Sequence, residues 1–268
     1  DFDSVELGPK VDEPLDGDHV WTDTGPIGWD VDRDGVPAGG VTEWRGWAFT
    51  DPDWWTATAG DQARSQFTKA SGAIAVADPD EWDDLGHDAG TYNTVLTSRL
   101  VWLTDIMPNT VRMIVDSSWR PEDYQRAACW VTFDGGDPVM LFEWDSQQGP
   151  NYKPDATNET LTVEIPNPAG ASVMLVHFAV LDAGNDWWWA IDNLAVYGRC
   201  ACDLNGDGRS DQSDLVAYLE LYTAGSPHAD LREPVGQITT ADLAAFLDAY
   251  TARRGTLDDG VRPIRQQR

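Results

Sequence analysis

The sequence predicts an all-β jelly roll, or β-sandwich, over residues 1–199, followed by a small α-helical module over residues 200–254. Two observations lead to this division. In the first 199 residues, short runs rich in Val, Thr, Trp and Phe recur between clusters of Gly, Pro, Asn and Asp, which is typical of proteins built from many short strands. After residue 200 the apolar residues recur with helical spacing instead.

The expected strands are short, and one of them indicates its own environment. Residues 160–165 read Thr-Leu-Thr-Val-Glu-Ile, a strict alternation that is typical of a strand with one face in water. No convincing helical stretch interrupts the first 199 residues. The predicted strands cover residues 41–49, 73–77, 94–103, 110–116, 127–133, 138–143, 160–165, 172–181 and 187–197.

A repeated amphipathic pattern predicts the helical module. Apolar residues stand at i, i+3, i+4 and i+7 of one segment, and the pattern returns 28 residues later (243 − 215). This spacing places one apolar stripe on each helix. We therefore expect two antiparallel helices whose shared core contains Leu215, Tyr218, Leu219 and Tyr222 from the first segment and Leu243, Phe246, Leu247 and Tyr250 from the second.

The loop before the first of these helices has the ligand spacing of a calcium site. Gly208 stands where such a loop turns sharply, and Arg209 can offer its backbone carbonyl. Calcium is a hard cation that takes roughly six to eight oxygen ligands. We therefore predict calcium as the cofactor of this loop. The candidate ligands are Asp203, Asn205, Asp207, Arg209, Asp211 and Asp214.

A calcium loop leading into a helix, duplicated at this short spacing, resembles a type I dockerin over about residues 200–254. The resemblance implies a module of paired calcium loops and helices that docks into a cohesin-like receptor. The second repeat departs from the pattern at four ligand positions. Leu231, Glu233, Val235 and Thr239 replace the ligands, whereas Gly236 and Asp242 remain. We therefore expect no calcium in the second loop.

Two further acidic segments are candidate calcium sites. Asp30, Asp32 and Asp34 match the first half of a calcium loop, but Ala38 and Val41 stand where later ligands belong. A hydrated hairpin turn is an equal alternative for that segment. In the second segment, carboxylates crowd one short loop, and their repulsion favours a counter-ion. They are Asp78, Asp80, Glu81, Asp83 and Asp84.

Composition and charge exclude several classes of partner. The 268 residues include 46 Asp and Glu against 18 Lys and Arg, so the net charge is −28. Nucleic acid and anionic membrane surfaces would be repelled. No apolar run approaches the roughly 18 residues that a membrane-spanning helix needs. Because the sequence begins at Asp1 without a Met, we expect a secreted protein, extracellular or at the cell surface, after removal of a signal peptide.

The three cysteines allow two interpretations. Cys129 lies in a strand-like run, whereas Cys200 and Cys202 flank the junction between the two predicted domains. A disulfide from Cys129 to either of them would link the module to the sandwich. The alternative is three buried thiols without a disulfide.

The first domain also carries a family resemblance. Residues 187–196 read Trp-Trp-Trp-Ala-Ile-Asp-Asn-Leu-Ala-Val and resemble the closing strand of MAM-like and related jelly-roll domains. A wider set of segments is similar to a domain that precedes metallophosphoesterase modules in secreted proteins of planctomycete-type bacteria. These segments are residues 1–5, 43–47, 76–82, 116–121 and 182–187. The resemblance implies the fold but no particular chemistry.

The sequence contains no recognisable catalytic motif. Gly-x-Ser-x-Gly, His-Glu-x-x-His and Cys-x-x-Cys are all absent. The four histidines, His19, His87, His177 and His228, are scattered, and none stands at metal-ligand spacing from another. His177 lies within an apolar strand, which predicts a core position. We therefore predict a protein that is not an enzyme.

The first functional hypothesis is a calcium-binding structural subunit of an extracellular filament or scaffold. A basic tail over residues 255–268 follows the module, and a basic arm on an acidic body suits docking onto a neighbouring subunit. The expected partners are copies of the chain in a homo-oligomer or polymer, or a cohesin-like receptor. The predicted docking residues are Arg253, Arg254, Arg262, Arg265 and Arg268.

The alternative is a carbohydrate-binding protein that is anchored through its dockerin-like domain. Tryptophan rings would then serve as stacking platforms for sugars. The candidates are Trp54 and Trp55 in one turn, with Trp187 and Trp189 in the last strand. The competing interpretation is that alternation buries about half of these rings and that the others cover loops.

Overall fold

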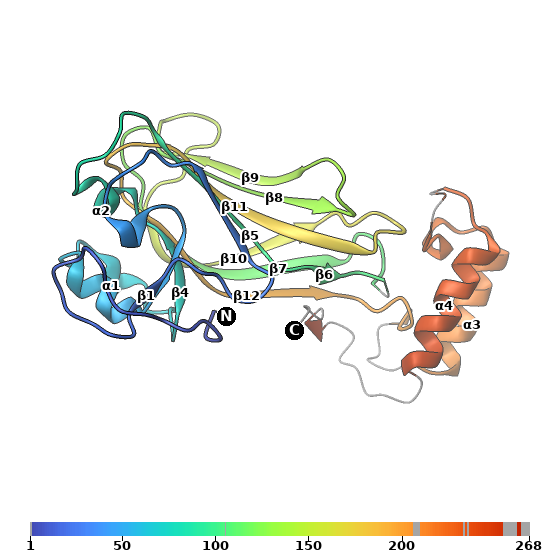
Figure 1. Ribbon diagram of the computed structural model, residues 1–268. Coiled ribbons are helices and arrows are strands. Elements are labelled where there is room, and N and C mark those ends of the chain that lie inside the picture. The colour runs from blue at the N-terminus through green and yellow to red at the C-terminus, as the bar shows by residue number, and fades with distance from the viewer. Residues whose placement is uncertain are drawn as a thin grey trace.

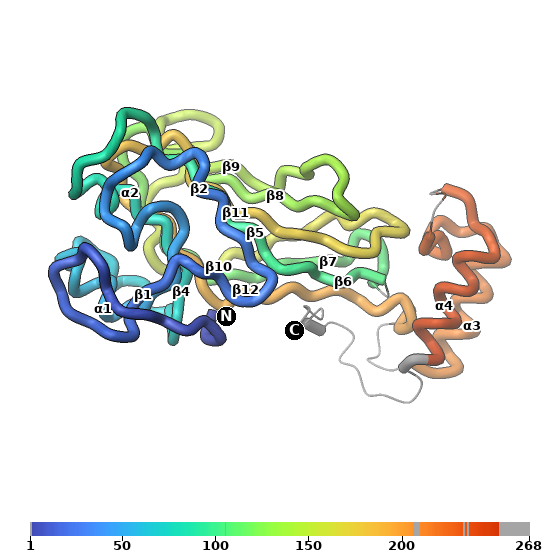
Figure 2. Tube along the Cα trace, viewed as in Figure 1, coloured from blue at the N-terminus to red at the C-terminus, as the bar shows by residue number. Residues whose placement is uncertain are grey.

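The computed structural model describes residues 2–104, 106–205, 210–232, 234, 236–253 and 262–263. Its main body is a sandwich of two antiparallel β-sheets, and two helices near the C-terminus lie beyond one end of it (Figures 1 and 2). The predicted sandwich is therefore confirmed. No described helix is long and apolar enough to cross a membrane.

The first sheet, sheet A, contains the closing strand near its centre. Its order is β1 (Trp21–Thr22), β3 (Ala48–Thr50), β4 (Ile74–Ala77), β12 (Trp189–Gly198), β7 (Val111–Trp119) and β10 (Ala156–Ile165), with β13 (Arg262–Pro263) also paired to β12. The predicted strand 41–49 is only partly correct. Its first residues form a 3-10 helix, Thr42–Trp44, because the chain turns there before it enters β3.

The second sheet, sheet B, faces solvent on its outer side. Its order is β2 (Asp30–Gly35), β5 (Tyr92–Thr97), β11 (Val173–Ala183), β8 (Arg126–Phe133) and β9 (Val139–Asp145), with β6 (Val101–Trp102) also paired to β11. The predicted strand 94–103 is divided between β5 and β6. Sheet B matters most for function, because its outer face carries the row of side chains described below.

Two short helices cover one end of the sandwich, α1 (Pro52–Thr58) and α2 (Pro79–Asp83) (Figure 1). Each begins in the same way, with an aspartate as N-cap and a proline directly after it. The side chain of Asp51 accepts a hydrogen bond from Trp54 N, and that of Asp78 accepts one from Glu81 N. This combination favours helix initiation, although both helices are too short to produce a clear apolar period.

Tryptophan rings fill the space between the two sheets. Trp189 lies at the centre of this cluster, with ring centroids 5.6 Å from Trp47, 5.4 Å from Trp144 and 5.8 Å from Phe178. Such edge-to-face and tilted contacts add to the stabilisation that comes from burying large apolar surfaces. Alternation along the strands therefore turns most of these rings inward.

The helices near the C-terminus, α3 (Gln212–Thr223) and α4 (Thr240–Arg253), have a hydrophobic cluster of their own. The rings of Tyr218 and Phe246 stack at its centre, with centroids 4.1 Å apart and planes 4° apart. The predicted core was wrong for Leu219 and Leu247, which are 40% and 38% exposed. The contact between the helices is centred on the aromatic pair, whereas Leu219 and Leu247 point to solvent.

The cysteines pair locally. Cys200 and Cys202 form a disulfide, whereas Cys129 is a buried free thiol on β8. The predicted disulfide from Cys129 was therefore wrong, and so was the alternative of three free thiols. Cys129 is paired in register with Phe178 on β11 and Phe142 on β9, so its side chain lies in the core, away from the junction.

Candidate functional site

A row of paired residues crosses the whole outer face of sheet B. Asp30 pairs with Thr97, Thr97 with His177, His177 with Trp130, and Trp130 with Met140. Directly paired residues of adjacent strands point to the same face of a sheet. The five side chains therefore form one continuous row over five strands, which we call the sheet B row.

Two aromatic rings form the middle of the sheet B row. The imidazole of His177 stacks on the indole of Trp130, with centroids 5.2 Å apart and planes 8° apart. The ring nitrogens of His177 lie 3.0 Å from Thr97 Oγ1 and 3.2 Å from Thr132 Oγ1. Burial lowers the pKa of His177 below 6.5, so the ring is neutral at neutral pH and can accept one of these hydrogen bonds while donating the other.

The predicted core position of His177 was wrong. Its neighbours in β11, Val176 and Phe178, are fully buried in the core, so the alternation of the strand turns His177 outward. The same alternation in β8 buries Cys129 and leaves Trp130 half-buried on the outer face. This alternation is visible in the sequence, but only the strand register brings the two rings together.

The surroundings of the row combine apolar and polar groups. Met140 is 55% exposed, and Trp102 on β6 is 41% exposed and pairs with Val173 further along the same face. On the other side of the row, Arg126 makes a 2.8 Å ion pair with Glu143 and a second ion pair with Asp182. The face therefore offers aromatic surface beside carboxylates and hydroxyls.

The predicted platform role was wrong for Trp54, Trp55 and Trp189. Trp55 and Trp189 are fully buried, and Trp54 is only 6% exposed. Their indole nitrogens are also engaged, since Trp55 Nε1 donates to Asp78 Oδ2 and Trp189 Nε1 donates to Ser117 Oγ. Trp187 is half-buried at the end of the sandwich, with the guanidinium of Arg120 lying 4.0 Å from its ring centroid.

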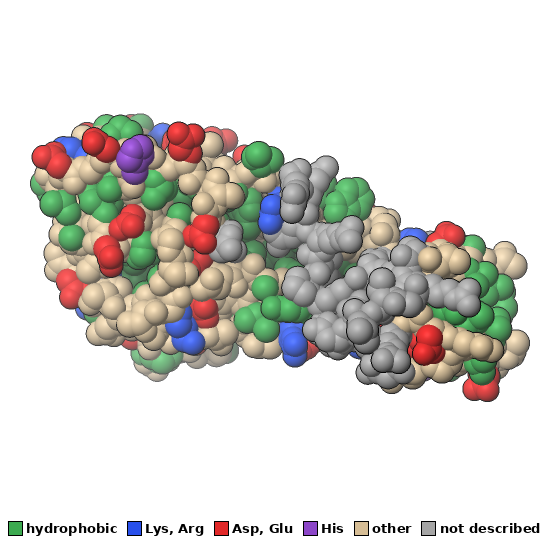
Figure 3. Space-filling model, turned by 90° about the horizontal axis from the view of Figure 1, so that it is seen from below, with side chains coloured by type: hydrophobic (Ala, Val, Ile, Leu, Met, Phe, Trp, Pro, Cys, Tyr) green, Lys and Arg blue, Asp and Glu red, His purple; other side chains and the backbone are tan. Residues whose placement is uncertain are grey.

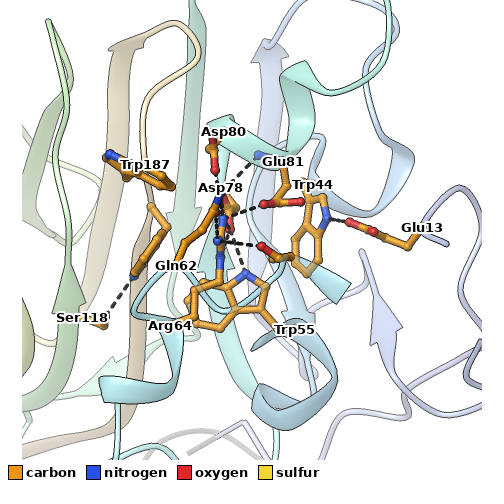
Figure 4. A network of polar contacts seen from close by, with 12 residues as sticks. Glu13, Trp44, Trp55, Gln62, Arg64, Asp78, Asp80, Glu81, Ser118 and Trp187 are labelled. Carbon is orange, nitrogen blue, oxygen red and sulfur yellow. Dashed lines mark hydrogen bonds and ion pairs between the residues drawn. The ribbon is translucent and has the colours of Figure 1, made fainter. Parts of the chain in front are cut away.

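A buried guanidinium neutralises the crowded acidic segment 78–84. Arg64 Nη2 lies 2.8 Å from Asp78 Oδ2, 3.3 Å from Asp80 Oδ2 and 2.9 Å from Glu81 Oε1 (Figure 4). The same guanidinium lies 4.4 Å from the ring centroid of Trp188. The expected counter-ion of these three carboxylates is thus Arg64 and not calcium.

The other two residues of that acidic segment have different surroundings. Asp83 pairs with His87, and Asp84 is the exposed C-cap of α2. The predicted metal group 78–84 was therefore wrong as a single cluster, because its carboxyl groups are divided between Arg64, His87 and solvent. The guanidinium of Arg64, which is distant in the sequence, takes the place of the metal ion that the crowded carboxylates suggested.

Three carboxylates around one guanidinium cannot all be ionised at low cost. Burial, followed by the charge of Asp78, raises the pKa of Asp80 to about 6 and that of Glu81 to about 8. Asp78 is hydrogen-bonded to Arg64 through both carboxyl oxygens. We therefore assign the negative charge that balances Arg64 to Asp78, and Glu81 is the group that keeps its proton longest.

This arrangement predicts that stability decreases as pH rises. The folded protein keeps the proton of Glu81 up to about pH 8, whereas the unfolded chain releases it near 4.5. The native state thus binds more protons, and the free energy of unfolding falls between these values. In urea unfolding, the free energy of unfolding of the Glu81→Gln variant should depend less steeply on pH. The slope should differ from that of the wild-type protein by up to about 1.4 kcal/mol per pH unit. Parallel profiles for the two proteins would contradict the assignment.

The candidate metal segment that contains Asp30, Asp32 and Asp34 is a strand and not a metal loop. Asp30 and Asp32 alternate with Val31 on the edge strand β2 and point outward. Asp32 Oδ1 accepts a hydrogen bond from Asp34 N at 2.9 Å, which is ordinary turn chemistry. Among the described residues, no three His, Cys, Asp or Glu side chains are arranged to hold a metal ion.

The predicted calcium loop 203–214 is described only in part, because Asp207 and Arg209 lie outside the described residues. Asp203 and Asp214 are buried. Asp214 Oδ1 accepts hydrogen bonds from Leu204 N at 2.9 Å and from Asn205 N at 3.2 Å. Its Oδ2 accepts one from Asp211 N. Calcium in this loop stays a prediction.

The second repeat reproduces this hydrogen-bond pattern with a different alignment. Asp242 Oδ1 accepts from Leu231 N at 2.7 Å and from Arg232 N at 2.8 Å, as Asp214 does from Leu204 N and Asn205 N. Asp230 therefore takes the place of Asp203, and the second loop is one residue longer. The gapless alignment, which placed Leu231 at that position, was wrong, because it could not show this insertion.

Most of the predicted docking residues lie outside the described part of the chain. Arg254, Arg265 and Arg268 are in this group, and the side chains of Arg253 and Arg262 are not described either. The backbone of β13 pairs with Tyr197 and Gly198 of the same chain. The described part of the tail thus contacts its own sandwich, and docking onto a neighbouring subunit stays a prediction.

The charge on the molecule is dispersed. Figure 3 shows acidic side chains spread over the underside of the sandwich, with few basic ones among them. Two hollows, of about 400 and 550 Å³, lie at the loop beside α4 and along the N-terminal segment. Neither is lined by residues of the sheet B row.

No protein-family model and no curated protein sequence matches this chain. Among solved structures, it is similar to the K1 cleaved adhesin domain of Lys-gingipain from Porphyromonas gingivalis W83, with a TM-score of 0.42, 13% identity, and coverage of 64% of this chain and 90% of that one. It is also similar to TmCBM61, solved with β-1,4-galactotriose, with a TM-score of 0.37, 14% identity, and coverage of 64% and 89%. For the mannan-recognising module TmCBM27 the TM-score is 0.30, with 11% identity and coverage of 67% and 88%. All three TM-scores lie below 0.5.

Proposed function

We propose that the chain is a carbohydrate-binding protein and that the sheet B row receives the sugar. The observation that carries this proposal is the pairing of a half-exposed indole, Trp130, with His177 between two threonine hydroxyls. Aromatic rings contact the apolar faces of sugars, and each threonine hydroxyl can still donate or accept a further hydrogen bond. Trp102 adds a second exposed ring on the same face.

The shape and charge of this face favour an extended, neutral glycan. With strands about 4.8 Å apart, the row is roughly 19 Å long and has room for several sugar units. Asp30 lies at one end, and Asp32 and Glu143 flank the row. Their negative charge, on a chain with a net charge of −28, would repel uronic acids and sulfated sugars.

We propose binding without catalysis. The carboxyls whose pKa is raised most are those of Asp80, Glu81 and Asp186. Asp80 and Glu81 contact the buried Arg64, and none of the three belongs to the sheet B row. In addition, we propose that the C-terminal helices and loop 203–214 serve as a calcium-dependent anchor, on the basis of the ligand spacing. The location outside the cell and the hypothesis of an assembly subunit also remain proposals.

Replacing Trp130 tests the binding site. Trp130→Ala should weaken binding to a neutral polysaccharide by at least about 2 kcal/mol, roughly thirtyfold, because it removes the central ring of the row. Affinity electrophoresis against a panel of neutral and acidic polysaccharides, with and without EDTA, measures this effect. The matched control is Trp187→Ala, which removes a half-buried indole outside the row and should leave binding unchanged. The proposal fails if the wild-type protein binds none of the panel, or if Trp130→Ala binds as well as it does.

A further inference from the structure

Three loops meet at the end of the sandwich that carries α1 and α2. They connect β7 to β8, β9 to β10, and β11 to β12. Gln125 joins them. Its side-chain Nε2 donates to Trp187 O at 2.8 Å, and its backbone carbonyl oxygen accepts from Ser146 N at 3.0 Å. This junction lies apart from the sheet B row and has no part in the proposed function.

Two oxygen atoms at this junction are buried without a hydrogen-bond partner. They are Oε1 of Gln125, a fully buried residue, and Oδ1 of Asp186, a residue that is 3% exposed. The other carboxyl oxygen of Asp186 accepts from Gly184 N at 2.7 Å. Burying an acceptor without a partner costs about 1–3 kcal/mol, and more for a charged group, so two such atoms in adjoining loops require an explanation.

The charges around Asp186 indicate which partner is missing. The carboxylates of Asp123, Glu122 and Asp80 lie close enough for their negative charge to act on Asp186. Arg120 is nearby, with its guanidinium over the ring of Trp187 and its Nη1 also buried without a hydrogen-bond partner. None of the ion pairs among the described residues joins it to Asp186. A bound water could satisfy the two acceptors, but it would leave the accumulated negative charge in place.

We propose that Asp186 and Gln125 bind a divalent cation, with calcium as the best match, and that this ion ties the three loops together. Both metal ligands would be oxygen atoms, one from a carboxylate and one from an amide. Calcium prefers such ligands in irregular geometry. The exposed carboxylates of Glu122 and Asp123 keep the local potential negative, and water completes the coordination. Because one protein ligand is a neutral amide, we expect weak binding, on the order of 10⁻⁴–10⁻³ M.

Terbium luminescence tests this site, because Trp187 and Trp188 directly follow Asp186 and can transfer energy to a bound lanthanide. All 14 tryptophans precede residue 200, so excitation selective for tryptophan favours ions held by the sandwich. The experiment uses the full chain with Asp203→Ala and Asp207→Ala, which removes the candidate loop site. We expect saturable emission that calcium displaces. Asp186→Asn should weaken terbium binding at least tenfold. The control Asp182→Asn, which changes an exposed aspartate near the end of β11, should not.

A second measurement does not depend on the Asp186 variant folding. Calcium should raise the melting temperature of the Asp203→Ala, Asp207→Ala chain, because the ion binds only the folded junction. An absence of tryptophan-sensitised emission, the same terbium affinity in Asp186→Asn, or a melting temperature that ignores calcium would each overturn the proposal. If water fills the junction, all three of these results are expected.

Discussion

Arg64→Met should destabilise the sandwich by about 3–5 kcal/mol, the usual cost of removing one partner from a buried ion pair. The side chains of Arg64 and Asp78 are both fully buried, and the two groups share hydrogen bonds of 2.8–3.1 Å. Without the guanidinium, the carboxylate of Asp78 stays buried beside the carboxyl groups of Asp80 and Glu81. The stacking of Arg64 on Trp188 is lost as well.

Urea unfolding followed by tryptophan fluorescence measures this effect, since Trp55 and Trp188 contact the guanidinium. The matched control is Arg126→Met, which removes an arginine that also pairs with two carboxylates but is 37% exposed. Exposed pairs contribute about 0–1 kcal/mol, so this variant should unfold almost like the wild-type protein. Equal losses for the two variants would show that burial of the Arg64 network has no special cost.

Phe246→Ala should destabilise the helical pair by about 3–5 kcal/mol, as expected for removing a fully buried aromatic side chain. The ring of Phe246 stacks on that of Tyr218, and both residues are fully buried in the cluster between α3 and α4. A cluster this small has few other apolar contacts with which to compensate.

Calorimetry of the full chain provides the measurement, because the helical pair has its own hydrophobic cluster and can unfold separately from the sandwich. We expect Phe246→Ala to lower the temperature of the unfolding transition of the helical pair, or to remove that transition. The temperature of the sandwich transition should not change. Leu247→Ala is the control, since that neighbour is 38% exposed and its loss should change stability by about 0.5 kcal/mol or less. A larger effect for Leu247→Ala than for Phe246→Ala would contradict the described packing.

Patterns within a contiguous stretch were enough to predict several features. Alternation in residues 160–165 corresponds to part of β10, and the repeat after residue 212 corresponds to α3 and α4. These inferences succeed because strand and helix periods depend on neighbours within a few residues. The calcium-loop spacing is a local signal of the same kind, although the loop is only partly described.

Most of the features that failed depend on residues far apart in the chain. The acidic segment 78–84 suggested a metal because its cation, Arg64, precedes it by 14 residues and reaches it only through the fold. Trp189 could not be distinguished from a surface ring until the two sheets enclosed it, nor Trp55 until α1 packed against Trp188 and Arg64. The predicted disulfide from Cys129 failed because Cys129 lies in the core of the sandwich, whereas Cys200 pairs locally with Cys202.

The sheet B row also combines a feature set by local sequence with one that depends on distant residues. The outward orientation of Trp130 and of His177 follows from alternation within each strand, but the stacking of the two rings follows from the register between β8 and β11. A shift of that register by one residue would move His177 to the opposite face. Strand register arises from the packing of the whole sandwich, so the candidate binding surface emerges only when the two sheets have assembled.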